Sequence, residues 1–287
     1  VVKDGDTYVC KGFETVADYK LKCHVFSTIG SHGSLTVEQA LMNSCNPYMI
    51  HLALEMGNSR FAYYQSLFGF GKITGIDLPG ETTGIVYGDR MTTIDAACNS
   101  FGQTINVNMM QMMAAYCSII NGGMLYQPHI VKRIESANGE VVKEYKANLV
   151  RQTITASTSK LLRRYLKNTV EEGTAKKAGV TGYSVAGKTG TAQKGDRKDN
   201  KWIISFIGHA PAENPKFAIY VVIDEPYGTT GTSGSSADVL TLTHNVLEKL
   251  LPYMNVYKDA SDEYEDTSSS PDELTVDGIP AGTASSN

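Results

Sequence analysis

The sequence predicts an α+β fold in which helices flank an antiparallel sheet. Three β-prone segments, joined by short polar turns, lie between residues 182 and 223, and strands connected in this way pair as antiparallel neighbours. Several helical segments come before them and one follows them. Helices that cover such a sheet form a layered α+β sandwich.

Six segments have a helical pattern or helix caps. They are residues 36–43, 47–56, 60–68, 108–121, 157–171 and 235–250. The first begins with Thr36 and Gln39, which have capping-box spacing. It ends just before Asn46, the predicted cap of the next helix, which has Pro47 at its first position. Ser44 and Asn46 therefore lie at a tight corner between two helices.

The predicted sheet strands cover residues 182–192, 201–209 and 216–223. A separate hairpin joins Ile130–Glu135 to Val141–Tyr145, because the Asn138-Gly139 pair between them is a strong turn signal.

A short motif of one lysine, two threonines and a glycine ends the first sheet strand. Its residues are Lys188, Thr189, Gly190 and Thr191. A glycine lets a ligand backbone approach the strand, and an ammonium group with two hydroxyls suits a carboxylate. The motif therefore indicates extended binding of a peptide-like carboxylate. Taken alone it also fits an ordinary strand end, as Ser44 and Asn46 fit ordinary helix ends.

Taken together, these motifs resemble those of the penicillin-binding protein transpeptidases. Ser44-Cys45-Asn46 and Lys188-Thr189-Gly190 match the second and third motifs of that family in order. Further stretches resemble its class B, membrane-anchored members: Phe101-Gly102-Gln103, Asn121-Gly122-Gly123, Glu172-Gly173-Thr174-Ala175, and the strand pair Trp202–His209 and Phe217–Ile223. The resemblance extends over most of the chain, from Leu35 to Leu250.

The family's nucleophilic serine lies in an S-x-x-K motif upstream of S-x-N, and no such motif precedes Ser44. The S-x-x-K that does occur, Ser157 to Lys160, opens a helical segment, so Ser157 is interpreted as a helix cap. The chain is expected to begin just past the catalytic helix and to be inactive alone. Two strands of the family's five-stranded sheet precede the nucleophile, so Phe217–Ile223 is expected to present an unpaired edge.

The resemblance implies a peptidoglycan D,D-transpeptidase that forms a serine acyl-enzyme with stem peptides and is acylated by β-lactams. Lys188 would supply a positive field, Ser44 would relay a proton and Asn46 would hold the substrate's side-chain amide. The backbone N–H of Thr191 would be an oxyanion donor. The substrate-binding residues would be Thr189, Gly190 and Thr191. No metal or organic cofactor is implied.

The implied partners are peptidoglycan stem peptides, β-lactam antibiotics and a lipid-linked glycan polymerase in the membrane. The implied location is the extracytoplasmic face of a bacterial membrane. Its anchor would be an N-terminal span outside these residues, because they contain no apolar run of about 18 residues. A β-lactam-sensing receptor, a β-lactamase of the same fold and a non-catalytic binding module are the alternatives. A β-lactamase needs a base for its deacylating water, and no candidate is obvious.

The 287 residues, 41% of them hydrophobic, are enough for one substantial core. Residues 258–287 carry eight acidic side chains and one lysine, which leaves a net charge of +3 on residues 1–257. This acidic, serine-rich stretch is predicted to be a disordered tail. Residues 1–34 would form an irregular segment and 35–257 the transpeptidase body. No basic patch with interleaved aromatics is present, so nucleic-acid binding is not indicated.

Two of the five cysteines, Cys10 and Cys23, flank a polar segment. They can form a disulfide outside the cytoplasm or remain free thiols. A zinc site is less favoured, because only His24 and His32 are nearby to complete a set of ligands.

The other three cysteines are expected to play packing roles. Cys98 and Cys117 lie in helical segments and are predicted to be small core residues. Cys45 is expected to turn away from the cleft. A protease pair of Cys45 with His51 lacks any recognisable third partner.

Overall fold

The computed structural model describes residues 3–195, 201–226 and 235–260. Its helices are α1 Val37–Met42, α2 Asn46–Met56, α3 Asn58–Leu67, α4 Thr93–Asn99, α5 Met109–Ile120, α6 Ala156–Glu171 and α7 Ala237–Tyr253. Its strands are β1 Thr7–Cys10, β2 Phe13–Val16, β3 Tyr19–Lys22, β4 Gly33–Thr36, β5 Met124–Tyr126, β6 Arg133–Glu135, β7 Val141–Glu144, β8 Leu149–Gln152, β9 Ala186–Lys194, β10 Lys201–Ala210 and β11 Phe217–Asp224. No helix in these described ranges is both long and apolar enough to cross a membrane.

The central sheet is the antiparallel meander that the sequence predicts. Its strand order is β11-β10-β9, so β9 and β11 form its two edges within the described residues. The register pairs Lys188 of β9 with Ile207 of β10. The edge position expected for the Phe217–Ile223 segment is therefore observed in β11.

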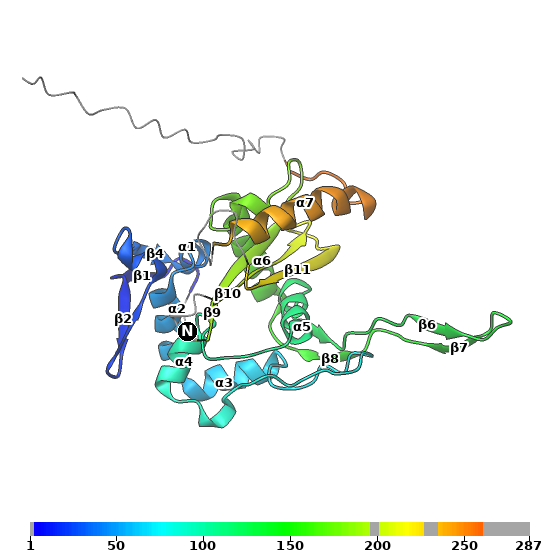
Figure 1. The fold of residues 1–287 in the computed structure, drawn as a ribbon, viewed down its shortest axis with the longest axis horizontal. Coiled ribbons are helices and arrows are strands. Elements are labelled where there is room, and N and C mark those ends of the chain that lie inside the picture. Colours follow the sequence, from blue (N-terminus) through cyan, green and yellow to red (C-terminus); the bar gives the residue numbers. More distant parts are fainter. Residues whose placement is uncertain (1–2, 196–200, 227–234, 261–287) are drawn as a thin grey trace, which may run out of the picture.

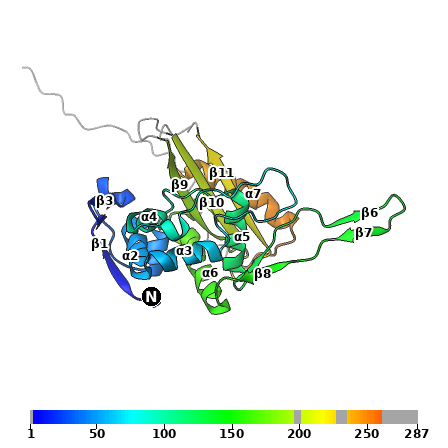
Figure 2. The ribbon, with the colours of Figure 1, turned by 90° about the horizontal axis from the view of Figure 1, so that it is seen from below.

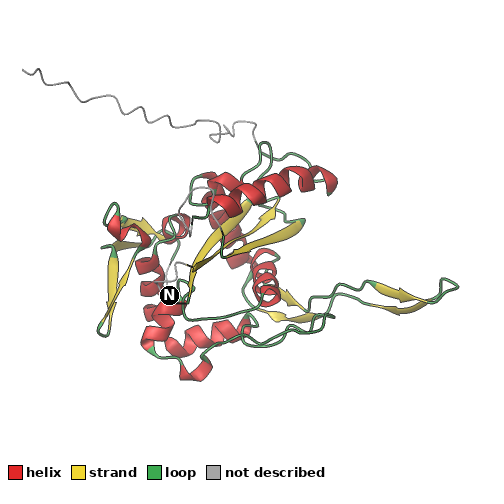
Figure 3. Ribbon diagram, in the orientation of Figure 1, coloured by secondary structure: helices red, strands yellow, loops and turns green. Residues whose placement is uncertain are grey.

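Helices cover both faces of this sheet (Figure 3). On one face Leu247 of α7 packs in a buried cluster with Phe206 of β10. On the other face Tyr116 of α5 and Leu166 of α6 pack with Ile207. Because apolar side chains point to both faces of β10, the sheet is buried between two helical layers. The predicted α+β sandwich is thus confirmed.

A second group of elements, formed by the N-terminal part of the chain, lies beside the sheet (Figures 1 and 2). Here α2 packs against α4 through Ile50 and Ala97. Two small antiparallel pairs, β1 with β4 and β2 with β3, flank these helices. Residues 1–34, expected to be irregular, therefore contain strands of four residues each. Such strands are too short for the sequence pattern to reveal.

The predicted hairpin is present as β6 and β7, which pair antiparallel. It projects from the body as a long arm (Figure 1). At its base β5 pairs with β8.

Two predicted helix caps are wrong. The cap of α2 is Cys45, in an extended conformation, so Asn46 is already the first helical residue. The cap of α6 is Thr155, whose side chain accepts a hydrogen bond from the backbone N–H of Thr158 at 3.2 Å. Ser157 lies in the first turn and is exposed. In each case a neighbour already occupies the N-cap position. The capping box of Thr36 and Gln39 is confirmed.

The predicted acidic tail, residues 258–287, is described only as far as residue 260. This first part is held to the body, because Asp259 accepts a hydrogen bond from the backbone N–H of Ser184 at 2.7 Å. Residues 261–287 lie outside the described part.

Candidate active site

Ser44 occupies a strained position at the end of α1. Its φ angle is +52°, in the left-handed region that favours glycine. The backbone N–H of Cys45 bonds the Ala40 carbonyl at 2.9 Å, and that of Ser44 bonds the Leu41 carbonyl at 3.2 Å. These two bonds form a Schellman motif, which ends α1 and turns the chain sharply. A serine at this position costs about 1–2 kcal/mol relative to a helical conformation.

Lys188 comes to this corner from the edge strand β9. Its Nζ donates to Ser44 Oγ at 2.5 Å, to the Thr189 carbonyl at 3.1 Å and to Thr189 Oγ1 at 3.2 Å. Three acceptors match the three N–H donors of an ammonium group. Because Lys188 shares its face of the sheet with Ile207, it points toward the layer of α5 and α6.

Thr174, for which the sequence predicts no role, completes the arrangement. Its Oγ1 lies 3.3 Å from Ser44 Oγ and 3.4 Å from Thr189 Oγ1. Lys188, Ser44, Thr174 and Thr189 thus form a closed ring of polar contacts, the Lys188 ring. In the sequence, Thr174 is marked only by its place in the Glu172-to-Ala175 stretch that resembles the family.

Gly173 allows Thr174 to reach this position. A Cβ on Gly173 would lie 2.8 Å from the carbonyl oxygen of Met42 and 2.9 Å from Thr169. The backbone N–H of Thr174 bonds that same Met42 carbonyl at 3.1 Å. The loop after α6 therefore packs directly on the end of α1, two residues before Ser44.

Burial of Lys188 lowers its pKa to about 8. Desolvation is the cause, because it disfavours the charged ammonium form of the side chain. The side chain is therefore mostly cationic at neutral pH but loses its proton more readily than an exposed lysine. Groups of this kind can both bind an anion and take part in proton transfer.

The other candidate residues lie near the Lys188 ring but outside it. The Asn46 side-chain amide donates to the Lys22 carbonyl at 3.3 Å. Gly190 pairs with Ser205, and Thr191 is exposed opposite Ile204. The structure thus joins Ser44, Lys188 and Thr189 directly, while Asn46, Gly190 and Thr191 flank them along the chain.

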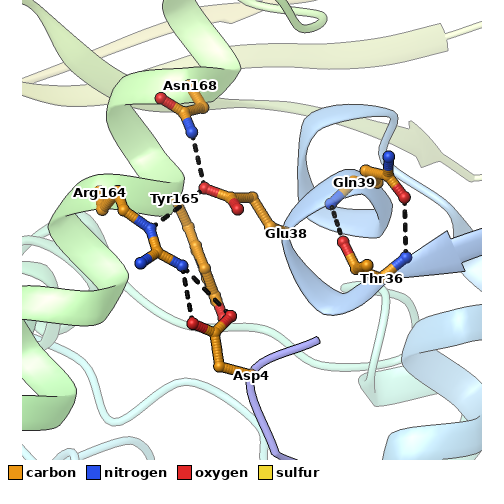
Figure 4. A network of polar contacts seen from close by, with 7 residues as sticks. All are labelled: Asp4, Thr36, Glu38, Gln39, Arg164, Tyr165 and Asn168. Carbon is orange, nitrogen blue, oxygen red and sulfur yellow. Dashed lines mark hydrogen bonds and ion pairs between the residues drawn. The ribbon is translucent and has the colours of Figure 1, made fainter. Parts of the chain in front are cut away.

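A polar network holds α1 in place against α6 (Figure 4). Asn168 donates to Glu38 of α1 at 2.6 Å, and Arg164 lies 3.4 Å from the same carboxylate. Arg164 and Tyr165 also bind Asp4, at 2.9 and 2.6 Å. Both hydrogen bonds hold the pKa of Asp4 below its usual range. The first turn of α1, the helix that leads to Ser44, is therefore held against α6, which itself packs on β9.

The cysteines near this corner are free thiols. Cys45 points into the core, as expected, where it joins Cys10, Cys23 and His32. The disulfide considered for Cys10 and Cys23 is not formed. Cys98 lies on α4 and Cys117 on α5, and both are half-buried.

A model of the penicillin-binding protein transpeptidase domain matches residues 1–247. The chain belongs to this family. The resemblance inferred from the two motifs is thereby confirmed.

Named relatives agree with this assignment. The chain is 39% identical over 256 residues to stage V sporulation protein D of Bacillus subtilis, covering 88% of this chain and 39% of that protein. It is 32% identical over 248 residues to the peptidoglycan D,D-transpeptidase FtsI of Escherichia coli, covering 84% of this chain and 40% of that protein. The chain thus spans less than half the length of these relatives.

Solved structures of the family share the fold. Penicillin-binding protein 3 of Mycobacterium tuberculosis, complexed with ampicillin, aligns with a TM-score of 0.79 and 27% identity over 90% of this chain and 59% of that one. Its aztreonam complex aligns with a TM-score of 0.78 and 28% identity, with the same coverage of both chains. The α+β fold of this chain is therefore that of the family's transpeptidase domains.

Proposed function

We propose that this chain forms the substrate-binding side of a peptidoglycan D,D-transpeptidase active site, and that the full-length protein is acylated by β-lactams. The observation that carries the proposal is the 2.5 Å contact between Lys188 Nζ and Ser44 Oγ, which joins two family motifs at one point. The ampicillin and aztreonam complexes of a relative support the β-lactam part.

In this proposal the nucleophilic serine and its lysine come from a segment outside these 287 residues. The S-x-x-K from Ser157 to Lys160 does not provide them, because both residues are exposed and Ser157 contacts the Thr155 hydroxyl at 2.9 Å. The nucleophile would attack the carbonyl of the penultimate D-alanine, form an ester and release the terminal D-alanine as an amine. An amine from a second stem peptide would then resolve the ester.

The Lys188 ring would provide the proton for that leaving amine. Ser44 can transfer its hydroxyl proton to the amine and be reprotonated by Lys188, whose low pKa makes this transfer accessible. Thr174 contacts the Ser44 hydroxyl directly, and Thr189 contacts both Thr174 and Lys188, so the ring would hold the Ser44 side chain in place.

Substrate binding would use the strand next to the ring. Lys188 with the hydroxyls of Thr189 and Thr191 would hold the terminal carboxylate, and Asn46 would hold the side-chain amide of the stem peptide. The Thr191 backbone N–H would be one oxyanion donor, a contribution of about 3 kcal/mol to the barrier. Gly190 leaves room for the peptide backbone at this edge.

The proposed location is the extracytoplasmic face of a bacterial membrane, with a lipid-linked glycan polymerase as partner. Both follow from the proposed reaction, because its substrates are peptidoglycan stem peptides and its partner must supply new glycan strands.

Labelling of the full-length protein with a fluorescent penicillin tests the proposal. Lys188→Ala should slow acylation by about two orders of magnitude or more, since it removes the cation from the ring. Lys194→Ala is the matched control, because Lys194 lies on the same strand but has a side chain that is 41% exposed and pairs with Asp224 and Glu225.

Mass spectrometry should place the penicilloyl group on a serine outside these 287 residues. Acylation of Ser157, or equal labelling of the Lys188→Ala variant and the wild-type protein, would contradict the proposal.

A further inference from the structure

Three cysteines and one histidine from separate segments meet in the core beside Ser44. Cys10 ends β1, Cys23 follows β3, His32 precedes β4 and Cys45 lies between α1 and α2. Their Sγ and Nδ1 atoms all lie within 4.8 Å of one another. The cysteines are at most 3% exposed and His32 is half-buried. We refer to these four residues as the cysteine–histidine cluster.

The two distances from His32 Nδ1 to sulfur atoms of the cluster match those of a tetrahedral metal site. Zn–S bonds of about 2.3 Å and Zn–N bonds of about 2.0 Å place neighbouring ligand atoms roughly 3.5–3.8 Å apart in a tetrahedral site. His32 Nδ1 lies 3.5 Å from Cys23 Sγ and 3.8 Å from Cys10 Sγ. A disulfide instead requires sulfur atoms about 2.05 Å apart, and all the cysteines in the described ranges are free.

The surroundings of Cys10 also favour a thiolate ligand. The backbone N–H of Gly12 donates to Cys10 Sγ at 3.4 Å, and such hydrogen bonds stabilise metal-bound sulfur. Gly12 has a φ of +85°, and a Cβ there would lie 2.0 Å from the Gly30 carbonyl oxygen. The turn that aims this N–H at the sulfur therefore requires glycine.

An ordinary core of thiols would explain burial but not this combination. Packing alone needs neither a histidine nitrogen directed at two sulfur atoms nor a backbone donor directed at one of them. A set of three sulfur ligands and one nitrogen ligand is typical of Zn²⁺ rather than of Ca²⁺ or Mg²⁺, which take oxygen ligands.

We propose that Cys10, Cys23, His32 and Cys45 form a structural Zn²⁺ site that fixes the corner carrying Ser44 and Asn46. Four protein ligands leave no open position, which is the arrangement of structural rather than catalytic zinc. The site would connect β1, β3 and β4 to the α1–α2 corner. These four-residue strands bury few side chains, so a metal is an effective cross-link between them.

The effect on the active site follows from chain connectivity. Cys45 lies directly between Ser44 and Asn46, and the Asn46 amide bonds the carbonyl of Lys22, the residue before Cys23. A metal that holds Cys23 and Cys45 therefore holds both neighbours. The zinc site itself does not depend on the proposed transpeptidase activity. Only its consequence for catalysis, through the positions of Ser44 and Asn46, rests on that proposed function.

Metal analysis of the full-length protein tests the proposal. The protein should be purified without chelators and without a polyhistidine tag, and its zinc content measured by plasma mass spectrometry. We expect about one Zn²⁺ per chain, as for a closed structural site. Cys23→Ser and Cys45→Ser should lose it, whereas Cys98→Ser and Cys117→Ser, which change cysteines outside the cluster, should keep it.

Cobalt substitution provides a readout that needs no variant. Co²⁺ exchanged into the wild-type protein should give the visible bands of a tetrahedral ion and thiolate-to-metal charge transfer in the near ultraviolet. Absence of both zinc and cobalt binding, a Cys10–Cys23 disulfide in the purified protein, or full zinc content in Cys23→Ser would overturn the proposal. Penicillin labelling of the same samples tests the proposed activity independently, so that a failure of metal binding can be told apart from a failure of acylation.

Discussion

Ser44 and Lys188 each occupy a state that their residue type disfavours. Ser44 takes a left-handed backbone conformation, and Lys188 carries its ammonium group into a partly buried position. Strained backbone and perturbed pKa values are concentrated at functional sites, because a stable fold can hold groups there in an unfavourable but reactive state. In the proposed reaction, the strained conformation of Ser44 places its hydroxyl 2.5 Å from Lys188 Nζ, where proton transfer between the two residues would occur.

The pKa of Lys188 predicts how acylation depends on pH. Since burial lowers this pKa from the usual 10.5 to about 8, Lys188 is protonated below pH 8 and neutral above it. We expect the second-order rate constant for penicillin acylation, which reports on the free enzyme, to fall as the pH rises through about 8. Lys188→Arg should lose this decline, because arginine stays charged. A wild-type profile that declines only near the usual lysine pKa would contradict the prediction.

Strand β9, which carries Lys188, contains two glycines, Gly187 and Gly190, that lie close to β10. A Cβ on Gly187 would lie 2.3 Å from the Phe206 ring and 2.6 Å from the Ile207 carbonyl oxygen. Phe206 is fully buried, so neither neighbour can move freely. A Cβ on Gly190 would meet chiefly the Ser205 hydroxyl, at 2.5 Å, which can rotate away. Position 187 therefore has no room for a side chain, whereas position 190 can accept a methyl group if the Ser205 hydroxyl rotates.

Gly187→Ala should consequently destabilise the protein by about 2 kcal/mol, the usual range for overpacking in a core. Gly190→Ala should change the free energy of unfolding by less than about 1 kcal/mol. Chemical denaturation of the two variants measures the difference. Similar stability losses for both would show that β9 does not approach β10 as closely at Gly187 as the structure indicates.

At the scale of the whole molecule, a buried histidine connects the sheet to its helical layer. His209 of β10 is fully buried and lies 2.8 Å from the hydroxyl of Tyr116 on α5. Its Nε2 lies 3.1 Å from the Ala212 carbonyl oxygen, which can only accept. Nε2 therefore carries the proton, and Nδ1 accepts from Tyr116. Burial lowers the pKa of His209 to about 4, so the folded protein keeps it neutral.

This neutral histidine should make global stability depend on pH. Because the pKa is about 4 in the folded state and 6.5 in the unfolded state, the unfolded chain binds more protons between these values. The free energy of unfolding should fall by about 3 kcal/mol as the pH drops from 6.5 to 4.

His209→Gln should show a shallower decline than the wild-type protein over the same range, in denaturant titrations at several pH values. The comparison with this variant is needed because carboxylates also titrate between pH 4 and 6.5 and contribute to the decline in both proteins. Identical slopes in the two proteins would contradict the prediction.

The sequence by itself determined much of this protein. The order of six of the seven described helices, the antiparallel meander, the β6–β7 hairpin and the capping box of α1 follow from local periodicity and turn residues, which act over a few positions. The short helix α4 and the short strands β1–β5 and β8 were not predicted. The family assignment followed from two short motifs in the right order. Local patterns failed where neighbours compete for one role, as Thr155 and Ser157 do at the start of α6.

Only the tertiary structure decided which distant residues meet. Lys188 and Ser44 are 144 positions apart, and Thr174 enters their ring because Gly173 lets one loop pack on the end of α1. In the same way Cys45 joins Cys10 and Cys23, although spacing alone suggested a pair of cysteines and no third. Such contacts depend on how whole elements pack in three dimensions. A linear pattern records only which residues are available for them.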